Sequence, residues 1–268
     1  MSIAFEARPI LKWAGGKQAI AIHLAKQFPS TGGVYFEPFV GGASVFVAFG
    51  PKKGVICDLN EWLIDTYLAI REDWSRVATI LDGMKNTKSE YLRIRAIQPN
   101  TLDLFQRAAH LVYLNKTCFR GLFRVNQRNQ FNVPYGAYDR RYYDLDNFQA
   151  FAAALGQVKI LCCDFEVGIA DATRRDFIYF DPPYYKLGGY SDFNRYTRFQ
   201  FRENDHVRLA AVCRELDHKG IRWAVSNSDT PFVKTLFKGY CMTQVANRRE
   251  INLRSQERGI SELLITNY

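Results

Sequence analysis

A short apolar run that ends in two consecutive prolines constrains the fold of this chain more than any other feature. Residues 177–180 are Phe-Ile-Tyr-Phe, and Asp181-Pro182-Pro183-Tyr184 follows directly. An apolar run of this length is typical of a buried strand, and a proline cannot donate a hydrogen bond to a sheet. The strand must therefore end here, and the two proline rings hold the following backbone rigid. We expect Asp181 and Tyr184 to lie fixed at the carboxyl end of this strand.

Ligands of open α/β sheets bind at the carboxyl ends of the strands, which makes this segment a candidate site. The Asp181 carboxylate and the Pro182 carbonyl oxygen accept hydrogen bonds, and the Tyr184 ring offers an aromatic face beside them. These groups suit a planar ring that carries an exocyclic NH2 group. A strand followed by a proline turn, without a ligand, is the alternative that the four residues leave open.

Alternating strand and helix patterns predict an α/β fold with a mostly parallel sheet and helices on both faces. The predicted strands are 34–39, 54–58, 158–163, 177–180, 221–226 and 262–266, and the predicted helices include 45–49, 61–84, 106–114 and 205–216. The 268 residues suffice for one large domain or for one domain with an insertion. Because the block from 62 to 150 interrupts the alternation, we expect an inserted, mostly helical lobe there. The sheet domain would then comprise 1–61 and 151–268.

The composition disfavours several classes of protein. No run of about 18 apolar residues is present and the N-terminus lacks a signal-peptide pattern, so we expect a cytoplasmic protein without a membrane helix. The six cysteines form no Cys-x-x-Cys pair and the four histidines are scattered, so neither a zinc site nor a disulfide framework is expected. Lys and Arg number 36 against 27 for Asp and Glu. This excess favours a polyanionic partner such as DNA or RNA, although an ordinary basic enzyme can have the same balance.

A second candidate site follows the first predicted strand. Gly41 and Gly42 come shortly after Phe39, and glycines here let the backbone approach a ligand that the next helix N-terminus faces. Asp58 ends the second predicted strand, where nucleotide-binding α/β folds place an acid for ribose hydroxyls. A tight turn without a ligand and a helix-capping aspartate are the alternatives.

Two further segments carry candidate ligand contacts. Lys12-Trp-Ala-Gly-Gly-Lys17 lacks the glycine and the Ser or Thr that a phosphate-binding loop requires, since the chain has Leu11 and Gln18 there. It can still bind an anionic or zwitterionic ligand, with Lys17 at a carboxylate, or it can simply begin a helix. Cys163-Asp-Phe165 follows another strand, where its carboxylate could accept from an amino group and its phenyl ring could pack on adenine.

Residues 107–141 combine seven Lys or Arg residues, one acid and several aromatic side chains. Basic groups can position phosphates and read guanine, and aromatic side chains can stack on bases or wedge between them. We therefore expect this segment to contact DNA. A solvated helix face is the alternative for its basic residues that recur every four positions: Lys116, Arg120, Arg124 and Arg128. A second basic cluster, which could hold phosphates or face solvent, comprises Arg248, Arg249, Arg254 and Arg258.

Taken together, these segments resemble the Dam family of DNA adenine-N6 methyltransferases. They span nearly the whole chain: Leu-Lys-Trp13-Ala-Gly-Gly-Lys17, Phe-Glu-Pro-Phe39-Val-Gly41-Gly42, Asp58-Leu-Asn60, Gly121-Leu-Phe-Arg124, Gln130-Phe-Asn-Val-Pro134-Tyr-Gly, Asp181-Pro-Pro-Tyr184 and Ser261-Glu-Leu-Leu. The resemblance implies a Rossmann-like fold, S-adenosylmethionine as cofactor, double-stranded DNA as substrate and, in many relatives, the recognition site GATC. A role in restriction-modification, in mismatch repair or in a phage stays open.

The resemblance also assigns roles to residues. Trp13 and Lys17 would line the methionine end of the cofactor, and Asp58 would hold its ribose. The full expected cofactor set is Trp13, Ala14, Gly15, Lys17, Phe39, Gly41, Asp58, Asp164, Phe165 and Asp181, with Phe165 at the adenine. The expected DNA-binding set is Lys116, Phe119, Arg120, Leu122, Arg124, Pro134 and Tyr138. Arg120 stands where a relative carries asparagine, which leaves the recognised sequence open.

The catalytic set is Asp181, Pro182 and Tyr184. Because the N6 of adenine is buried in a duplex, the base must leave the stack, and Tyr184 would then stack on it. Asp181 and the Pro182 carbonyl would accept the N6 hydrogens and expose the nitrogen lone pair for in-line attack on the methyl group. No metal is implied, and a monomer is expected, since one asymmetric lobe can read a palindrome one strand at a time. An RNA or protein methyltransferase with the same core and a non-catalytic DNA-binding module are the alternatives.

Overall fold

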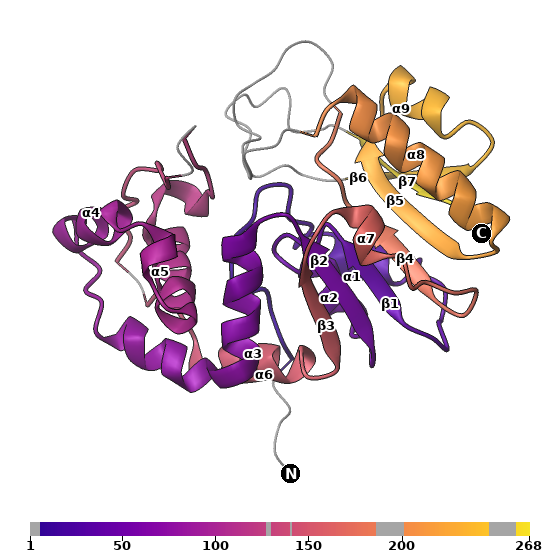
Figure 1. Ribbon diagram of the computed structural model, residues 1–268. Coiled ribbons are helices and arrows are strands. Elements are labelled where there is room, and N and C mark those ends of the chain that lie inside the picture. The colour runs from indigo at the N-terminus through magenta and orange to yellow at the C-terminus, as the bar shows by residue number, and fades with distance from the viewer. Residues whose placement is uncertain (1–5, 127–129, 140, 186–200, 247–260) are drawn as a thin grey trace.

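The computed structural model describes residues 6–126, 130–139, 141–185, 201–246 and 261–268, and Figure 1 shows its architecture. A seven-stranded sheet has the order β3-β2-β1-β4-β5-β7-β6. The strands are β1 Tyr35–Pro38, β2 Gly54–Asp58, β3 Val158–Cys162, β4 Phe177–Phe180, β5 Arg222–Ser228, β6 Cys241–Ala246 and β7 Ser261–Thr266. The first five are parallel, whereas β7 runs antiparallel between β5 and β6. This arrangement confirms the predicted α/β fold and mostly parallel sheet.

Both faces of the central strands β1, β4 and β5 are buried, and successive residues of a strand face opposite layers. In β4, Phe177 and Tyr179 pack into one apolar cluster, while Ile178 and Phe180 pack into the other. Helices α1 (Ala21–Ala25), α2 (Ser44–Phe49) and α3 (Glu61–Asp82) contribute to the first cluster. Helices α7 (Phe165–Gly168), α8 (Glu203–His218) and α9 (Pro231–Leu236) contribute to the second. A strand covered on both faces needs apolar residues at every position, which is why 177–180 is a continuous apolar run.

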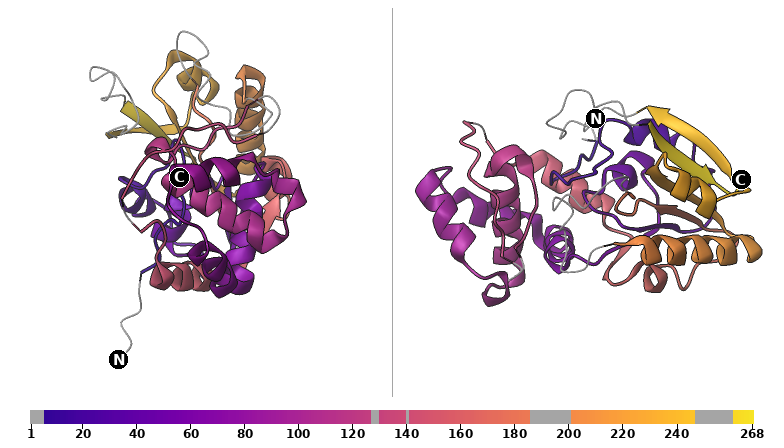
Figure 2. Two further views of the ribbon diagram at one scale, coloured as in Figure 1. Left: turned by 90° about the vertical axis from the view of Figure 1, so that its left-hand side faces the viewer. Right: turned by 90° about the horizontal axis from the view of Figure 1, so that it is seen from above.

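Between β2 and β3 the chain forms α3, α4 (Lys88–Ala96), a 3-10 turn (η1, Pro99–Thr101), α5 (Leu104–Thr117), a second 3-10 turn (η2, Phe119–Gly121) and α6 (Leu145–Ala154). In Figures 1 and 2, α4 and α5 stand to one side of the sheet, far from β5–β7. The apolar cluster on the first face of the sheet continues through α3 into α4, α5 and α6. These helices therefore share a core with the sheet and do not enclose a separate one.

The ends of the helices follow local signals. Asn60 caps α3 by accepting a hydrogen bond from the Leu63 backbone, and Asp103 with Gln106 forms a capping box at the start of α5. After α5, two isolated bridges join Cys118 to Tyr135 and Val125 to Phe131. Among the described residues, no helix combines the length and the apolar character needed to cross a membrane.

Strand β6 and helix α4 are among the regular elements for which the sequence predicted no bounds, and helices α1, α6, α7 and α9 are others. The side chains of β6 are mostly exposed and its sequence mixes polar and apolar residues, so it lacks the apolar run of a central strand. Helix α4 buries only Tyr91 and Ile94 of its nine residues, so its apolar periodicity is weak. Helix α4 packs on α5 and strand β6 pairs with β7, and local apolar patterns do not reveal these contacts.

Candidate active site

The segments predicted to form a site lie along one edge of the sheet. Phe39–Gly42 follows β1, Asp58 ends β2, Asp164 follows β3 and Asp181 follows β4. The four strands are parallel neighbours, so their carboxyl ends point the same way. The sheet therefore brings these residues to the edge at which α/β proteins bind ligands.

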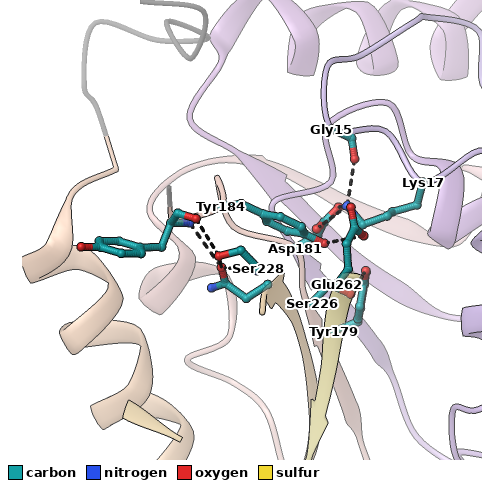
Figure 3. A network of polar contacts seen from close by, with 10 residues as sticks. Gly15, Lys17, Tyr179, Asp181, Tyr184, Ser226, Ser228 and Glu262 are labelled. Carbon is teal, nitrogen blue, oxygen red and sulfur yellow. Dashed lines mark hydrogen bonds and ion pairs between the residues drawn. The ribbon is translucent and has the colours of Figure 1, made fainter. Parts of the chain in front are cut away.

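Asp181 forms an ion pair with Lys17, which is only 2% exposed (Figure 3). The Lys17 ammonium donates hydrogen bonds of 2.9 Å to Asp181 Oδ2 and to the carbonyl oxygen of Gly15. Asp181 Oδ1 lies 2.9 Å from the same ammonium, yet it is buried and accepts no hydrogen bond from the residues that the structure describes. A buried carboxylate oxygen in this state is a candidate acceptor for a donor group of a ligand.

Tyr184 is held from several directions. Its hydroxyl donates a 3.0 Å hydrogen bond to Glu262 Oε2, and the Lys17 ammonium lies 4.6 Å from the centre of its ring. Next to it, the backbone N–H of Tyr185 donates to Asn227 and its carbonyl oxygen accepts a 2.6 Å bond from the Ser228 hydroxyl. Two residues at the end of β5 therefore add to the rigidity that the prolines impose, and Pro182 itself is buried.

Burial and neighbouring charges change the protonation of two carboxyl groups here. Burial raises the pKa of Asp181 to about 6, even though Lys17 lowers it. Burial also raises the pKa of Glu37 to about 8, against the hydrogen bond that the Tyr35 hydroxyl donates to it over 2.7 Å. At neutral pH the site therefore combines a largely ionised Asp181 with a protonated Glu37.

Gly41 connects the first strand to Asp58 and to Trp13. The Gly41 N–H donates to Asp58 Oδ2 over 3.1 Å, and the Tyr67 hydroxyl donates to the Gly41 carbonyl. The φ of Gly41 is +44°, and a Cβ at this position would lie 2.8 Å from Cδ1 of the Trp13 ring. A glycine is therefore required by the turn and by Trp13, whether or not a ligand approaches.

The segment around Trp13 is a turn and not the start of a helix. The backbone N–H of Gly16 donates to the carbonyl of Trp13, which encloses Ala14 and Gly15, and α1 begins only at Ala21. The turn aims Lys17 at Asp181, so the N-terminal segment before α1 is joined through one side chain to the end of β4.

Phe39, Asp164 and Phe165 are also brought together. The Phe165 ring is 3% exposed and stacks on Phe39 with centroids 5.3 Å apart, while the Arg208 guanidinium lies 4.4 Å from its centre. Arg208 donates two hydrogen bonds, of 3.1 and 2.9 Å, to the Asp164 carboxylate, which also caps α7. Asp164 and Phe165, the two residues considered for binding adenine, are thus packed against Arg208 of α8.

All seven residues of the expected DNA-binding set are at least partly exposed, and six of them lie in the segment that follows α5. The Phe119 N–H donates to the Pro134 carbonyl, the Arg120 N–H donates to the Tyr138 hydroxyl, and the Arg124 guanidinium donates to Asn132 Oδ1. Lys116 lies in the last turn of α5, and Leu122 lies between Arg120 and Arg124. Arg120 has a φ of +59°, which is uncommon for a residue with a side chain.

A buried ring links this surface to the strand ends. Phe123 stacks on Trp13 with ring centroids 4.8 Å apart, and Trp13 in turn lies against Gly41. The segment expected to contact DNA and the segment expected to hold a cofactor are therefore in direct contact. The second basic cluster, Arg248, Arg249, Arg254 and Arg258, and also Arg128 lie outside the described residues.

Several residues of the site were not predicted from the sequence: Glu37, Arg208, Asn227, Ser228 and Glu262. Glu37 and Glu262 did carry a signal, because each is a charged residue inside a buried strand that is otherwise largely apolar. A buried carboxylate is costly unless it is hydrogen-bonded, so such a residue points to a polar site. Arg208 and Asn227 carried no comparable local signal.

Comparison with known proteins identifies the family of the chain. The family model of the D12 class N6 adenine-specific DNA methyltransferases matches residues 13–251. The chain is 37% identical to the type II methyltransferase M.MjaIII of Methanocaldococcus jannaschii, over 98% of this chain and 100% of that protein. It is 35% identical to the type II methyltransferase M1.LlaDCHI of Lactococcus lactis subsp. cremoris, over 97% and 95%, and 32% identical to a DNA adenine methylase of Haemophilus influenzae, over 94% and 90%. The chain therefore belongs to the D12 class of N6 adenine-specific DNA methyltransferases.

Proposed function

We propose that this enzyme transfers a methyl group from S-adenosylmethionine to the N6 of an adenine that has left the stack of duplex DNA, within the sequence GATC. The observation that carries the proposal is Asp181 Oδ1, a buried acceptor at the carboxyl end of β4 beside the Gly41–Asp58 edge. It matches the amino group of a planar base. The family name supports the same reaction.

The residues at the strand ends fit the proposed cofactor. Asp58 ends β2 with its carboxylate on the Gly41 N–H, where it can accept from ribose hydroxyls. Trp13, Ala14, Gly15 and Lys17 would hold the amino-acid end, and Phe39, Gly41, Asp164 and Phe165 would hold the nucleoside. S-adenosylmethionine supplies an electrophilic methyl group on a sulfonium. We place cofactor binding and chemistry in 1–61 and 151–268.

In this mechanism the chain orients the base and accepts hydrogen bonds from its amino group. The bond from N6 to the methyl carbon forms as the methyl–sulfur bond breaks, and N6 then releases one proton, for which the Asp181 carboxylate is an acceptor. Tyr184 stacks on the extruded adenine, while Asp181 and the Pro182 carbonyl accept the two N6 hydrogens. Because the lone pair of N6 is delocalised into the ring, two acceptors that draw the nitrogen toward tetrahedral geometry make it a better nucleophile. The acceptors are fixed before the base arrives, so little reorganisation is needed. Lys17 keeps the Asp181 carboxylate in place and favours its ionised form.

We assign DNA recognition to the block 62–150. The surface formed by Lys116, Phe119, Arg120, Leu122, Arg124, Pro134 and Tyr138 presents cations and an aromatic ring that is 46% exposed, Phe119. Arg124 would read a guanine, and Phe119 would enter the duplex beside the extruded base. Two relatives are named type II methyltransferases, which favours a role in restriction-modification.

The test is methyl transfer from labelled S-adenosylmethionine to two duplexes that differ only in GATC or a scrambled site, with a duplex RNA as the third substrate. Labelled N6-methyladenine in the GATC duplex alone is the expected result. Equal transfer to both DNA duplexes would leave the reaction intact and refute the assigned site. Transfer to the RNA alone would refute DNA as the substrate.

A further inference from the structure

Glu262 is a buried carboxylate in a strand that is otherwise largely apolar. It belongs to β7, it is 4% exposed, and the next three residues, Leu263 to Ile265, are almost fully buried. Burying a carboxylate costs free energy unless hydrogen bonds compensate. The compensation includes the hydroxyl of Tyr184, which reaches Glu262 Oε2 over 3.0 Å. The contact joins β7, the strand in antiparallel orientation, to the segment that follows β4 (Figure 3).

The position of this hydrogen bond determines which motion of Tyr184 it restrains. The backbone is already restrained by the two prolines, by the hydrogen bond that the Tyr185 N–H donates to Asn227, and by the one that the Ser228 hydroxyl donates to the Tyr185 carbonyl oxygen. The side chain keeps two torsions. The hydroxyl oxygen lies on the axis of χ2, the torsion about Cβ–Cγ, so a hydrogen bond to this oxygen leaves rotation of the ring about that axis free. The same bond restrains χ1, the torsion about Cα–Cβ that swings the whole ring. The Lys17 ammonium, 4.6 Å from the ring centre, faces the ring itself.

We infer that Glu262 is a positioning residue that fixes the swing of the Tyr184 ring through its hydroxyl, so that the ring is in place for the target base. The inference rests on the proposed function, in which Tyr184 stacks on that base. Without Glu262 the Tyr184 ring would still be present, but part of the binding free energy of the base would be offset by the cost of ordering that ring. The effect would therefore appear in the orientation of the base and in the rate of transfer, and not in cofactor affinity.

Glu262 also has an electrostatic effect that a purely structural residue would lack. The charge of Glu262 raises the pKa of Asp181, so replacing Glu262 by glutamine should lower that pKa. In a plot of kcat/KM for the cofactor against pH, the acidic limb should then move to lower pH. Several other titratable or charged groups face Asp181, and they are retained in the variant: Lys17, Tyr35, Glu37, Tyr179 and Tyr184. Their presence in both proteins isolates the contribution of Glu262.

The experiment uses a methylated duplex in which the target adenine is replaced by 2-aminopurine, whose fluorescence rises on extrusion and falls on stacking against an aromatic ring. Single-turnover methylation of the normal duplex and cofactor affinity are measured in parallel. The variants are E262Q, E262A, Y184F and the double variant E262A/Y184F. Glu203→Ala is the matched control, because Glu203 accepts a hydrogen bond from the hydroxyl of the neighbouring Tyr185 on the exposed surface.

We expect E262Q, which keeps an acceptor, to retain its transfer rate at its pH optimum within about threefold and to show the shifted acidic limb. E262A should lose about tenfold or more in transfer rate, as expected for one lost orienting bond, with brighter 2-aminopurine and unchanged cofactor affinity. Y184F should lose at least as much as E262A, because it also removes the contact of the Tyr184 hydroxyl with Asp181. The double variant should be no worse than Y184F, because both changes break the bond between Tyr184 and Glu262. Glu203→Ala should match the unmodified enzyme.

Two results would overturn the inference. One is an E262A protein with an unmodified rate and fluorescence, and the other is a double variant whose loss is the product of the two single losses. Tyr184→Ala separates this failure from failure of the proposed function. A strong loss in Tyr184→Ala together with an unaffected E262A refutes only the role of Glu262. An unaffected Tyr184→Ala refutes the stacking role itself, and with it the inference.

Discussion

Replacing Glu37 by glutamine should stabilise the protein, and the gain should grow with pH. The Glu37 side chain is 2% exposed, and its pKa is raised from 4.5 to about 8, chiefly by burial. An unfolded chain releases the proton near pH 4.5, whereas the folded protein retains it to about pH 8. Folding therefore requires uptake of a proton throughout this interval, and stability from this group is complete below pH 4.5 and is lost as the pH rises to about 8.

The magnitude follows from the two pKa values. A difference of about 3.5 pKa units corresponds to about 5 kcal/mol between the acidic and the alkaline limit. Between about pH 5.5 and 8 the expected loss is about 3 kcal/mol. Glutamine has the same shape and can still accept the hydrogen bond from Tyr35. It does not titrate, so the stability of Glu37→Gln should exceed that of the unmodified protein by an amount that increases by about 3 kcal/mol over this range.

Urea unfolding at a series of pH values measures this difference directly. Glu72→Gln, which removes a carboxylate from the exposed surface of α3, is the matched control for the chemical change. A stability difference between Glu37→Gln and the unmodified protein that stays constant from about pH 5.5 to 8 would refute the argument, since it would mean that Glu37 is ionised in the folded protein.

Three further changes test other parts of the site. Gly41→Ala should cost about 1–3 kcal/mol of stability and weaken cofactor binding, because φ is +44° and the new Cβ would meet the Trp13 ring. The measurements are thermal unfolding and calorimetry, and the control is Gly32→Ala, where a Cβ would enter open space. Lys17→Met should raise the pKa of Asp181 above about 6 and move the acidic limb of kcat/KM for the cofactor to higher pH; an unmoved limb would contradict the ion pair. Arg124→Ala should reduce discrimination against single-base variants of the site by about 10- to 100-fold, whereas Arg93→Ala, on exposed α4, should not; equal discrimination in both would refute base reading by Arg124.

The strands of the sheet were largely predictable because their signals are local. Residues 177–180 form β4 with the predicted bounds, since an apolar run and two prolines specify where the strand lies and ends. Gly54–Asp58 likewise forms β2 as predicted. The edge strand β6 was missed because its exposed side chains relax the need for apolar residues, and α4 was missed because only two of its residues are buried.

The candidate site was predictable only as far as parallel strands place their carboxyl ends together. This geometry brings Asp58 and Asp181 to one edge whatever their sequence separation. The partners that hold these residues come from elements whose position depends on the order of the strands. Glu262 reaches Tyr184 only because β7 inserts between β5 and β6, and Arg208 reaches Asp164 only because α8 packs over that face. No local pattern specifies such contacts.

The most direct test of the account is single-turnover transfer of a labelled methyl group to a GATC duplex by Asp181→Ala, with N6-methyladenine quantified and binding of cofactor and DNA measured on the same protein. Asp181 is assigned the acceptor for the N6 hydrogens, and it is ion-paired to Lys17 at the end of β4. We expect the transfer rate to fall by about a thousandfold, as for loss of a placed polar group in an active site, while the protein stays folded and binds both ligands. A rate near that of the unmodified enzyme would contradict the central claim.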